Sequence, residues 1–320
     1  MSKIVVTGGA GFIGSHLAEE LAKEHKVVVV DNLDDYYSPE IKRANLELLR
    51  RSKNITFVHG DITDPHLVQE IIDTDVDYVF HEAAQAGVRV SVNDPFKPNR
   101  INVLGTLNVL SAALQAGVER VINASSSSVY GKVQYLPFDE KHPTQPVSPY
   151  GVSKLAAEHY CRVFYEVYGL PTVSLRYFTV YGPRMRPDLA ISIFTGRLLR
   201  NEPITIFGDG SKTRDFTYID DIVDANIRLL RTGEADGGVL NIGGGSAVSI
   251  ADLAKKLKAL TGSRSEILYA EKQMGDAEHT LADTALARRT IGFEPMTSID
   301  EGLRKFVQWY ASVVRVPEAK

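Results

Sequence analysis

Tyr150 and Lys154 are the residues whose types and spacing best suit acid–base chemistry. They stand four positions apart in the stretch YGVSK, and residues at positions i and i+4 of a helix share one face. An ammonium beside a phenol favours the phenolate, so it should lower a phenol pKa that is ordinarily about 10. A serine-rich run, NASSSSVYG at 123–131, precedes them and offers a hydroxyl to the same substrate oxygen. The pattern predicts that Tyr150 acts as a general base.

A glycine-rich turn near the N-terminus predicts a dinucleotide site. Gly8, Gly11 and Gly14 follow the strand-like run KIVV, and a helix is expected to begin near Ser15. Glycines there allow a tight turn and let the backbone approach a pyrophosphate, while the helix N-terminus supplies amide donors. The G-x-x-G-x-x-G spacing is the form seen in short-chain dehydrogenase/reductase-type proteins. The alternative is a glycine-rich turn that binds no ligand.

Acidic residues after the next two strand-like runs predict the adenosine end of that site. Asp31 ends the run KVVVV, 17 residues after Gly14, where a carboxylate can accept hydrogen bonds from both ribose hydroxyls. It would repel a 2′-phosphate, and no Arg or Lys follows it directly, so NAD is favoured over NADP. Asp61 and Ile62 follow a third strand-like run, at a position where they could contact the amino group of the adenine. The alternative is that Asp61 caps the helix PHLVQEII.

The elements that must position these residues alternate along the first half of the chain. Six β-branched runs are separated mostly by amphipathic segments, which predicts parallel strands joined by crossover helices in a doubly wound sheet. The runs are KIVVTGG, HKVVVVDN, NITFVHGD, VDYVFHEAA, RVINASS and TVSLRYF. After about residue 180, Gly/Pro-rich pieces separate shorter helices, which indicates a smaller C-terminal α/β lobe beside the sheet.

Composition narrows the class of protein. The 320 residues are 44% hydrophobic and 24% charged, as in a globular chain, and the net charge of −4 gives no attraction to nucleic acid or an anionic membrane. Cys161 has no partner for a disulfide, and the eight histidines lack ligand spacing, so we predict no metal. No apolar run reaches the roughly 18 residues of a spanning helix, and no signal peptide is evident. A cytoplasmic location is expected.

Further segments carry a resemblance to a known family. They are DNLDDYYSPEIKRANLELL at 31–49, HEAAQAGVRVS at 81–91, ASSSSVYG at 124–131, RYFTVYGPRMRPDLAI at 176–191, TRDFTYIDDIV at 213–223 and QMGDAEHTLAD at 273–283. With them the chain resembles an extended short-chain dehydrogenase/reductase of the nucleotide-sugar epimerase/dehydratase group, closest to UDP-glucuronate 4-epimerases. UDP-glucose 4-epimerases share several of the segments. The resemblance implies a Rossmann-type NAD-binding domain over 1–178 and a UDP-sugar-binding lobe over 179–320, with the chain crossing between them more than once.

The resemblance also implies a mechanism. Aligned on the segment Val129–Gly131, the catalytic hydroxyl falls on Ser126, beside Tyr150 and Lys154. Tyr150 would take the 4-hydroxyl proton while hydride passes from C4 of the sugar to NAD, giving a 4-keto sugar. The ring would then swing about its link to the diphosphate, and hydride would return to the opposite face. NAD ends unchanged and is expected to stay bound.

Binding residues are implied in two sets. For the cofactor they are Gly8, Gly11, Phe12, Ile13, Gly14, Asp31, Asn32, Asp61, Ile62, Ala83, Ala84, Gln85, Asn102, Tyr150, Lys154 and Tyr177. For the UDP-sugar they are Gln85, Arg89, Ser126, Ser127, Ser128, Thr179, Arg186, Arg214, Gln273 and Asp276. Arg214 is the candidate for the diphosphate, because a guanidinium can bind two oxygens. A surface salt bridge from Arg214 to Asp215 or Asp221 is the alternative.

The sugar's 6-position decides the substrate. A glucuronate carboxylate needs several donors, because burying an unpaired charge is costly. The hydroxyls of Ser126, Ser127, Ser128 and Thr179 and the charge of Arg186 could supply them. Thr179 and Gln273 stand where UDP-glucose epimerases tend to carry Asn and Arg, which leans toward glucuronate. The stretch Arg184–Arg186 departs from the Trp-Gly-Arg often seen in glucuronate epimerases, so UDP-glucose stays open.

Proteins with other functions share this fold. A 4,6-dehydratase would carry an Asp-Glu pair, and a UDP-glucuronate decarboxylase a Glu, where this chain has Ser127 and Ser128. A non-catalytic NAD sensor would have no need of Ser126, Tyr150 and Lys154 together. By resemblance, residues 99–117 and the helix that holds Tyr150 would pair two subunits into a homodimer. The apolar faces of these helices could equally pack inside one chain.

Overall fold

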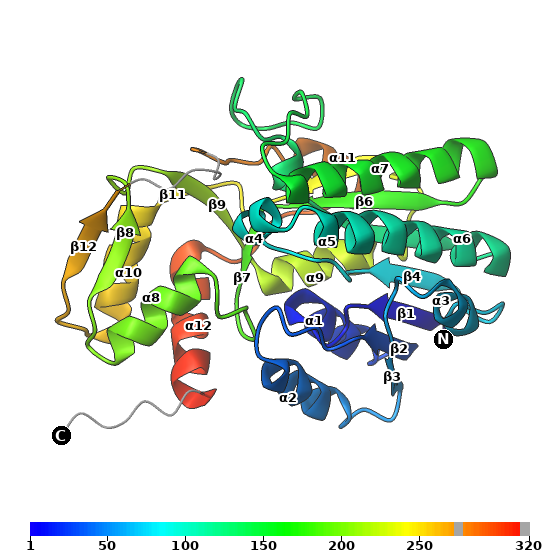
Figure 1. Cartoon of the computed structure of the whole chain (residues 1–320), viewed down its shortest axis with the longest axis horizontal. Helices are drawn as coiled ribbons and strands as arrows, with labels where there is room; N and C mark the ends of the chain where they lie inside the picture. The colour runs from blue at the N-terminus through cyan, green and yellow to red at the C-terminus, as the bar shows by residue number, and fades with distance from the viewer. Residues whose placement is uncertain (272–277, 314–320) are drawn as a thin grey trace.

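The six β-branched runs form neighbouring strands of one parallel sheet, and a seventh strand joins from late in the chain. The computed structural model describes residues 1–271 and 278–313 (Figure 1). The strand order is β10-β6-β5-β4-β1-β2-β3, and each neighbouring pair is parallel. The strands are β1 (Lys3–Thr7), β2 (Lys26–Asp31), β3 (Ile55–His59), β4 (Tyr78–His81), β5 (Arg120–Ser126), β6 (Thr172–Tyr177) and β10 (Val239–Ile242). The predicted fold class is confirmed.

Alternating side chains supply both faces of this sheet. In β1, Ile4 and Val6 pack into one hydrophobic cluster while Val5 packs into another, and Phe80 and Val79 of β4 divide in the same way. Both faces must therefore be covered by helices, which explains why these strands are almost wholly apolar. α1 packs against both α2 and α9, and α6 packs against both α3 and α7, as expected for a doubly wound sheet.

The helices largely follow the expected positions, with two differences. They are α1 (Phe12–Leu21), α2 (Pro39–Leu49), α3 (Pro65–Ile71), α4 (Val88–Asn93), α5 (Phe96–Pro98), the π-helix η1 (Asn99–Gly105), α6 (Thr106–Ala116), the 3-10 helix η2 (Ser127–Val129), α7 (Pro149–Tyr168), α8 (Ala190–Leu199), α9 (Ile219–Arg228), α10 (Ile250–Thr261), α11 (Ala285–Ile291) and α12 (Ile299–Val313). The first begins at Phe12, earlier than predicted, because Gly11 already serves as its N-cap. Residues 99–117 are not one regular helix, since η1 precedes α6.

A smaller lobe stands beside the large sheet, on the left in Figure 1. It holds the three-stranded sheet β11-β9-β7 and the two-stranded sheet β12-β8. Its strands are β7 (Thr179–Tyr181), β8 (Ile204–Phe207), β9 (Thr213–Tyr218), β11 (Ala247–Ser249) and β12 (Ile267–Ala270). Between them in sequence, α9 packs on α1 and β10 pairs with β6, so the chain passes from the smaller lobe back to the large sheet.

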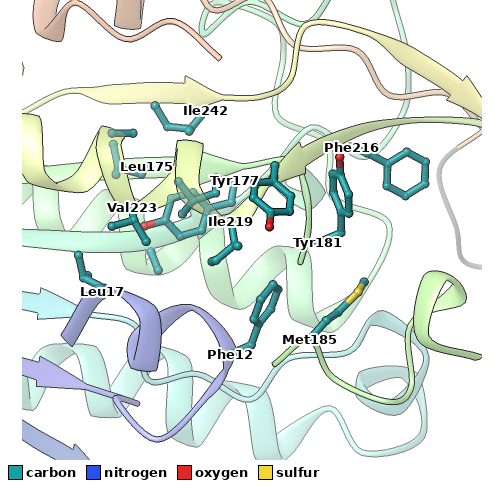
Figure 2. Close-up of a cluster of buried hydrophobic side chains, with 14 of the residues drawn as sticks. Phe12, Leu17, Leu175, Tyr177, Tyr181, Met185, Phe216, Ile219, Val223 and Ile242 are labelled. Carbon is teal, nitrogen blue, oxygen red and sulfur yellow. The ribbon is translucent and has the colours of Figure 1, made fainter. Parts of the chain in front are cut away.

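One hydrophobic cluster runs through both lobes. Phe12 of α1 and Tyr177 of β6 belong to it together with Tyr181, Met185 and Phe216 from the smaller lobe (Figure 2). All five side chains are at most 8% exposed. The core therefore ties the two lobes together directly behind the glycine-rich turn.

Candidate active site

A cavity of about 680 Å³ lies at the carboxyl ends of the strands of the large sheet and extends toward the smaller lobe. This is the edge at which open parallel sheets bind ligands, because loops from neighbouring strands diverge there. The volume lies within the usual range for small-molecule sites. Its lining contains nearly all of the predicted site residues.

The glycine-rich turn is shaped for close approach. Gly8 has φ +67°, and a Cβ there would lie 2.7 Å from the Ala83 backbone. A Cβ on Gly14 would lie 2.4 Å from the Gly8 carbonyl oxygen, so only glycine lets α1 start so near the turn. Gly11, Phe12 and Ile13, at the N-terminus of α1, line the cavity. These features fit the pyrophosphate of a dinucleotide such as NAD.

The end of the cavity that is predicted to bind adenosine, called the adenosine end below, is built around Asp31. Its carboxylate accepts hydrogen bonds from the amides of Leu33, at 2.8 Å, and Ala10, at 3.2 Å. The Lys42 ammonium lies 3.3 Å away and both side chains are buried. Lys42 was not predicted, because it stands on α2 rather than next to Asp31 in sequence. Its place on the buried stripe of α2, with Asn45, was the available signal.

Asp61 lies beside Asp31 but does not cap a helix. Its carboxylate accepts hydrogen bonds from Asn32 Nδ2, at 2.9 Å, and from the Thr63 amide, at 2.8 Å. The N-cap of α3 is Asp64, whose side chain accepts from the first amides of that helix. The capping alternative for Asp61 is therefore wrong. Asp61, Asn32 and Ile62 all line the cavity.

The reacting end joins β5 to α7. β5 ends at Ser126, whose hydroxyl accepts a hydrogen bond from the Ser128 amide at 3.1 Å and lies near enough to the Tyr150 phenol to lower its pKa. α7 begins at Pro149 because the Ser148 side chain caps it, and its first turn carries Tyr150. One turn on, the Lys154 ammonium donates to the Ala124 carbonyl at 2.6 Å. The three residues therefore lie together on the cavity wall.

Burial dominates the electrostatics at the reacting end. Burial raises the pKa of Tyr150, while the Ser126 hydrogen bond and the Arg186 guanidinium lower it, and the net shift is upward. In the chain alone, burial outweighs the favourable contacts; the predicted lowering of the phenol pKa, which also counts the positive ring of bound oxidised NAD, stays a prediction. Burial lowers the pKa of Lys154 to about 8, and the Glu82 carboxylate opposes that change. Glu82 was not singled out in the sequence.

Behind this end lies a buried ion pair that the sequence did not indicate. Glu158, one turn beyond Lys154 on α7, pairs with Arg176 of β6 at 2.7 Å, and both side chains are about 5% exposed or less. The Ser125 hydroxyl also donates to Glu158. Arg176 further contacts the Tyr130 ring. This network fixes α7 against the ends of β5 and β6, and so orients the catalytic face.

Several predicted substrate residues line the same cavity. Ser127, Ser128, Thr179, Arg89 and Arg214 lie on its wall, as do Ala83, Ala84, Gln85 and Tyr177 from the cofactor set. The Arg214 guanidinium donates to the carbonyls of Thr213, at 2.9 Å, and Glu278, at 3.3 Å. Lys212, which was not predicted, also lines the cavity.

One predicted residue, Asn102, is placed differently, and two others cannot be compared. Asn102 is buried outside the cavity lining of the described residues, where its side chain accepts from the Gln85 amide at 2.7 Å and donates to Ser153 at 2.9 Å. It therefore supports the Gln85 backbone. Gln273 and Asp276 lie outside the described residues.

Arg186 is held in a cluster at the cavity wall. Its Nε donates to Asp188 at 3.0 Å, and its guanidinium lies 5.4 Å from the centre of the Tyr36 ring. The Tyr36 hydroxyl donates to the same carboxylate at 2.9 Å. Gly87 has φ +106°, and a Cβ there would lie 2.4 Å from that hydroxyl. The cluster thus links the loop after β2 to the segment after β7 across the cavity.

Two other features are absent from the described ranges. Residues 1–271 and 278–313 hold no group of three or more His, Cys, Asp or Glu side chains placed to bind a metal ion. No helix in these ranges has the length and apolarity needed to cross a membrane.

Comparison with known proteins identifies the family. Residues 4–243 match the NAD dependent epimerase/dehydratase family. A UDP-glucuronate 4-epimerase from Thermodesulfobacterium geofontis is 40% identical over 97% of this chain and 96% of that protein. The crystal structure of the UDP-glucuronic acid 4-epimerase from Bacillus cereus, in complex with UDP-glucuronic acid and NAD, superposes with a TM-score of 0.91, at 36% identity, over 98% of this chain and 100% of that one.

A relative with a different substrate name is as similar. The UDP-glucose 4-epimerase from Thermotoga maritima, crystallised with UDP-glucose, gives a TM-score of 0.90 at 38% identity, over 97% of this chain and 99% of that one. The family resemblance and the NAD dependence predicted from the sequence are confirmed at the level of the family. This chain belongs to the NAD-dependent epimerase/dehydratase family.

Proposed function

We propose that this protein is a UDP-sugar 4-epimerase that uses NAD, with UDP-glucuronate as its preferred substrate. The observation that carries the activity is the meeting of Ser126, Tyr150 and Lys154 in one cavity with the glycine-rich turn. Relatives named as UDP-sugar 4-epimerases match nearly the whole chain, which supports the same assignment.

The chain's own residues divide the work at C4. When bound, NAD supplies the hydride acceptor and a positive ring. Tyr150 takes the proton of the 4-hydroxyl and later returns it, and Ser126 hydrogen-bonds the phenol to hold it in line. Arg186 and the pyridinium ring both favour the phenolate against the effect of burial. Lys154, fixed to the Ala124 carbonyl, adds a donor and a nearby positive charge.

The preference for glucuronate rests on the donors around the sugar end. Ser127, Ser128 and Thr179 line the cavity, and so does Arg186, which belongs to the segment 184–189. A carboxylate at C6 would find several donors there, as its burial requires. A 4-keto-glucuronate is a β-keto acid that loses carbon dioxide readily, so the same donors must also hold the carboxylate where its departure is disfavoured. Arg214, with Lys212 nearby, is proposed to bind the diphosphate.

UDP-glucose is a second candidate substrate, and one observation favours it. Arg186 already pairs with Asp188 through both Nε and a terminal nitrogen, at 3.0 and 3.1 Å. The pair has no net charge, so it gives less attraction to an anionic sugar than a lone guanidinium would. Dehydration is less well supported, because Ser127 and Ser128 replace the acid and base that removal of water at C5 and C6 would need.

A product analysis separates these activities. The purified protein, without added cofactor, is incubated in parallel with UDP-glucuronate, UDP-glucose and UDP-N-acetylglucosamine, and the C4 epimers are separated. We expect UDP-galacturonate as the main product and the highest rate with UDP-glucuronate. A higher rate with UDP-glucose would overturn the substrate assignment, and UDP-pentose as the main product would identify a decarboxylase. No epimer from any substrate, by a protein that retains NAD, would overturn the activity.

We also propose that the protein is a cytoplasmic homodimer, with a second copy covering an apolar stripe on α7. Val152, Tyr160, Val163 and Val167 recur at helical spacing on this helix and are 38% to 67% exposed, beside Leu104 of η1 at 47%. Light scattering tests the assembly. We expect a dimer mass, and the Val163→Asp variant should give a monomer mass. A monomer at all concentrations would overturn the dimer.

A further inference from the structure

Glu82 is an acidic residue at the reacting end that the mechanism above does not use. It follows the last residue of β4, and its amide donates to the Thr7 carbonyl at 3.2 Å. Its backbone lies against the glycine-rich turn, because a Cβ on Gly8 would come within 2.9 Å of its carbonyl carbon. Its side chain lines the cavity. A carboxylate therefore stands between the pyrophosphate turn and the catalytic residues.

The carboxylate is held by a hydrogen bond from β6, and a residue of α9 supports that donor. The Tyr177 hydroxyl donates to Glu82 Oε1 at 2.8 Å, and the Asn226 amide nitrogen donates to the Tyr177 hydroxyl at 2.8 Å. Tyr177 stands opposite Ser126 in the β5–β6 register. The hydrogen bond between Tyr177 and Glu82 thus crosses the end of β5, next to Ser126.

The same carboxylate acts on both catalytic groups. It raises the pKa of the Lys154 ammonium and the pKa of the Tyr150 phenol, as a nearby negative charge must. Burial raises its own pKa to about 7, so it is ionised above neutral pH. A hydride acceptor that serves the sugar carbon beside Tyr150 has to enter this part of the cavity. The positive ring of oxidised NAD would therefore share a small, buried space with this negative charge.

We propose that Glu82 supplies a fixed negative charge that favours oxidised over reduced nicotinamide at this site. The inference rests on the proposed function only in that NAD binds in this cavity. Hydride transfer removes the positive charge of the ring, so the carboxylate loses its partner whenever the cofactor is reduced. This raises the free energy of the reduced state and favours return of the hydride. The keto sugar is therefore held for a shorter time, and fewer molecules are trapped with NADH.

The test compares the bound forms of the cofactor directly. Holoenzyme and the Glu82→Gln variant are equilibrated above pH 7 with an equimolar mixture of NAD and NADH, and free dinucleotide is removed by gel filtration. The bound oxidised and reduced forms are then measured by absorbance. Glutamine keeps an oxygen to accept from Tyr177 but carries no charge. We expect the bound ratio of NADH to NAD to rise about tenfold, the order of magnitude for removing one nearby charge at an effective dielectric constant of about 20.

Two further variants separate charge from packing. Glu82→Leu removes both the charge and the acceptor, and should shift the ratio as far as Glu82→Gln does. Glu140→Gln removes another half-buried carboxylate with a raised pKa, which accepts from the Asn241 amide at 2.8 Å outside the cavity lining, and should leave the ratio unchanged. An unchanged ratio in Glu82→Gln would overturn the inference while leaving the epimerase proposal intact. A wild-type protein that binds neither dinucleotide would overturn both.

Discussion

The two ends of the cavity differ in how they stabilise charged side chains. At the adenosine end, Asp31 and Asp61 accept hydrogen bonds from backbone amides and neighbouring side chains, and Lys42 balances the charge. At the reacting end, burial raises the pKa of Tyr150 and lowers that of Lys154 to about 8. The first end is pre-arranged to hold a ligand that does not change. At the second end, burial disfavours the charged forms of both groups.

The strongest way to break the reacting end is Tyr150→Phe. The variant loses the only proposed proton acceptor but keeps the ring, so turnover should fall by about 100- to 10,000-fold, the usual contribution of general acid–base catalysis. NAD content after purification should be unchanged. Rates with UDP-glucuronate and the absorbance ratio of the purified protein measure the two effects. Full activity in this variant would remove Tyr150 from the mechanism.

The matching change at the adenosine end is Asp31→Asn. It leaves the buried Lys42 without its counter-charge and weakens the bonds to the ribose, so NAD affinity should fall by about 10- to 100-fold, as for hydrogen bonds to charged groups. The turnover number at saturating NAD should change little. Calorimetric titration with NAD and with NADP checks this. If turnover fell while affinity held, the separation of the two ends would be wrong.

The pH dependence of stability sharpens the electrostatic difference. The pKa of Glu82 is raised from 4.5 to about 7 in the folded protein, so folded chains bind more protons than unfolded ones between these values. The free energy of unfolding of the wild type, relative to Glu82→Gln, should therefore fall as pH rises from 4.5 to 7 and stay level above 7. The expected change is on the order of 3 kcal/mol. Urea unfolding of both variants across this range measures it, and a pH-independent difference would contradict it.

The smallest expected effect comes from Tyr36→Phe, at the edge between the two ends. The variant keeps the ring under Arg186 but loses the hydrogen bond to Asp188, which is worth about 1 kcal/mol. We expect KM for the UDP-sugar to change by about fivefold, with kcat nearly constant. Tyr135→Phe is the control, because Tyr135 makes a similar bond to Asp139, at 2.8 Å, outside the cavity lining. Equal effects in both variants would show that Tyr36 has no special role.

The parallel sheet and the glycine-rich turn could be predicted because they depend on local sequence. The glycine spacing requires a particular turn, and the β-branched runs suit strands buried on both faces. Lys42 could not be paired with Asp31 in this way, since the contact depends on how α2 packs. The choice of Asp64 over Asp61 as a helix cap also depends on where the turn after β3 ends.

At the reacting end, the sequence indicated which residues meet but not how deeply they are buried or which other side chains surround them. The spacing of Tyr150 and Lys154 gave their shared face, whereas the net shift of the phenol pKa depends on burial, which the sequence does not state. The partners Glu82 and Tyr177 are 95 residues apart and meet only because β4 and β6 flank β5 in the sheet. Such contacts follow from topology rather than from spacing.

The hydrophobic cluster that spans both lobes limits how the molecule can move. Phe12 leaves the glycine-rich turn and packs beside Met185 and Tyr181, so a hinge between the lobes would expose these side chains to water (Figure 2). The two lobes that form the walls of the cavity are therefore held rigidly with respect to each other. In the proposed reaction the sugar presents first one face and then the other to the cofactor. The sugar itself must therefore rotate while the cavity walls stay in place.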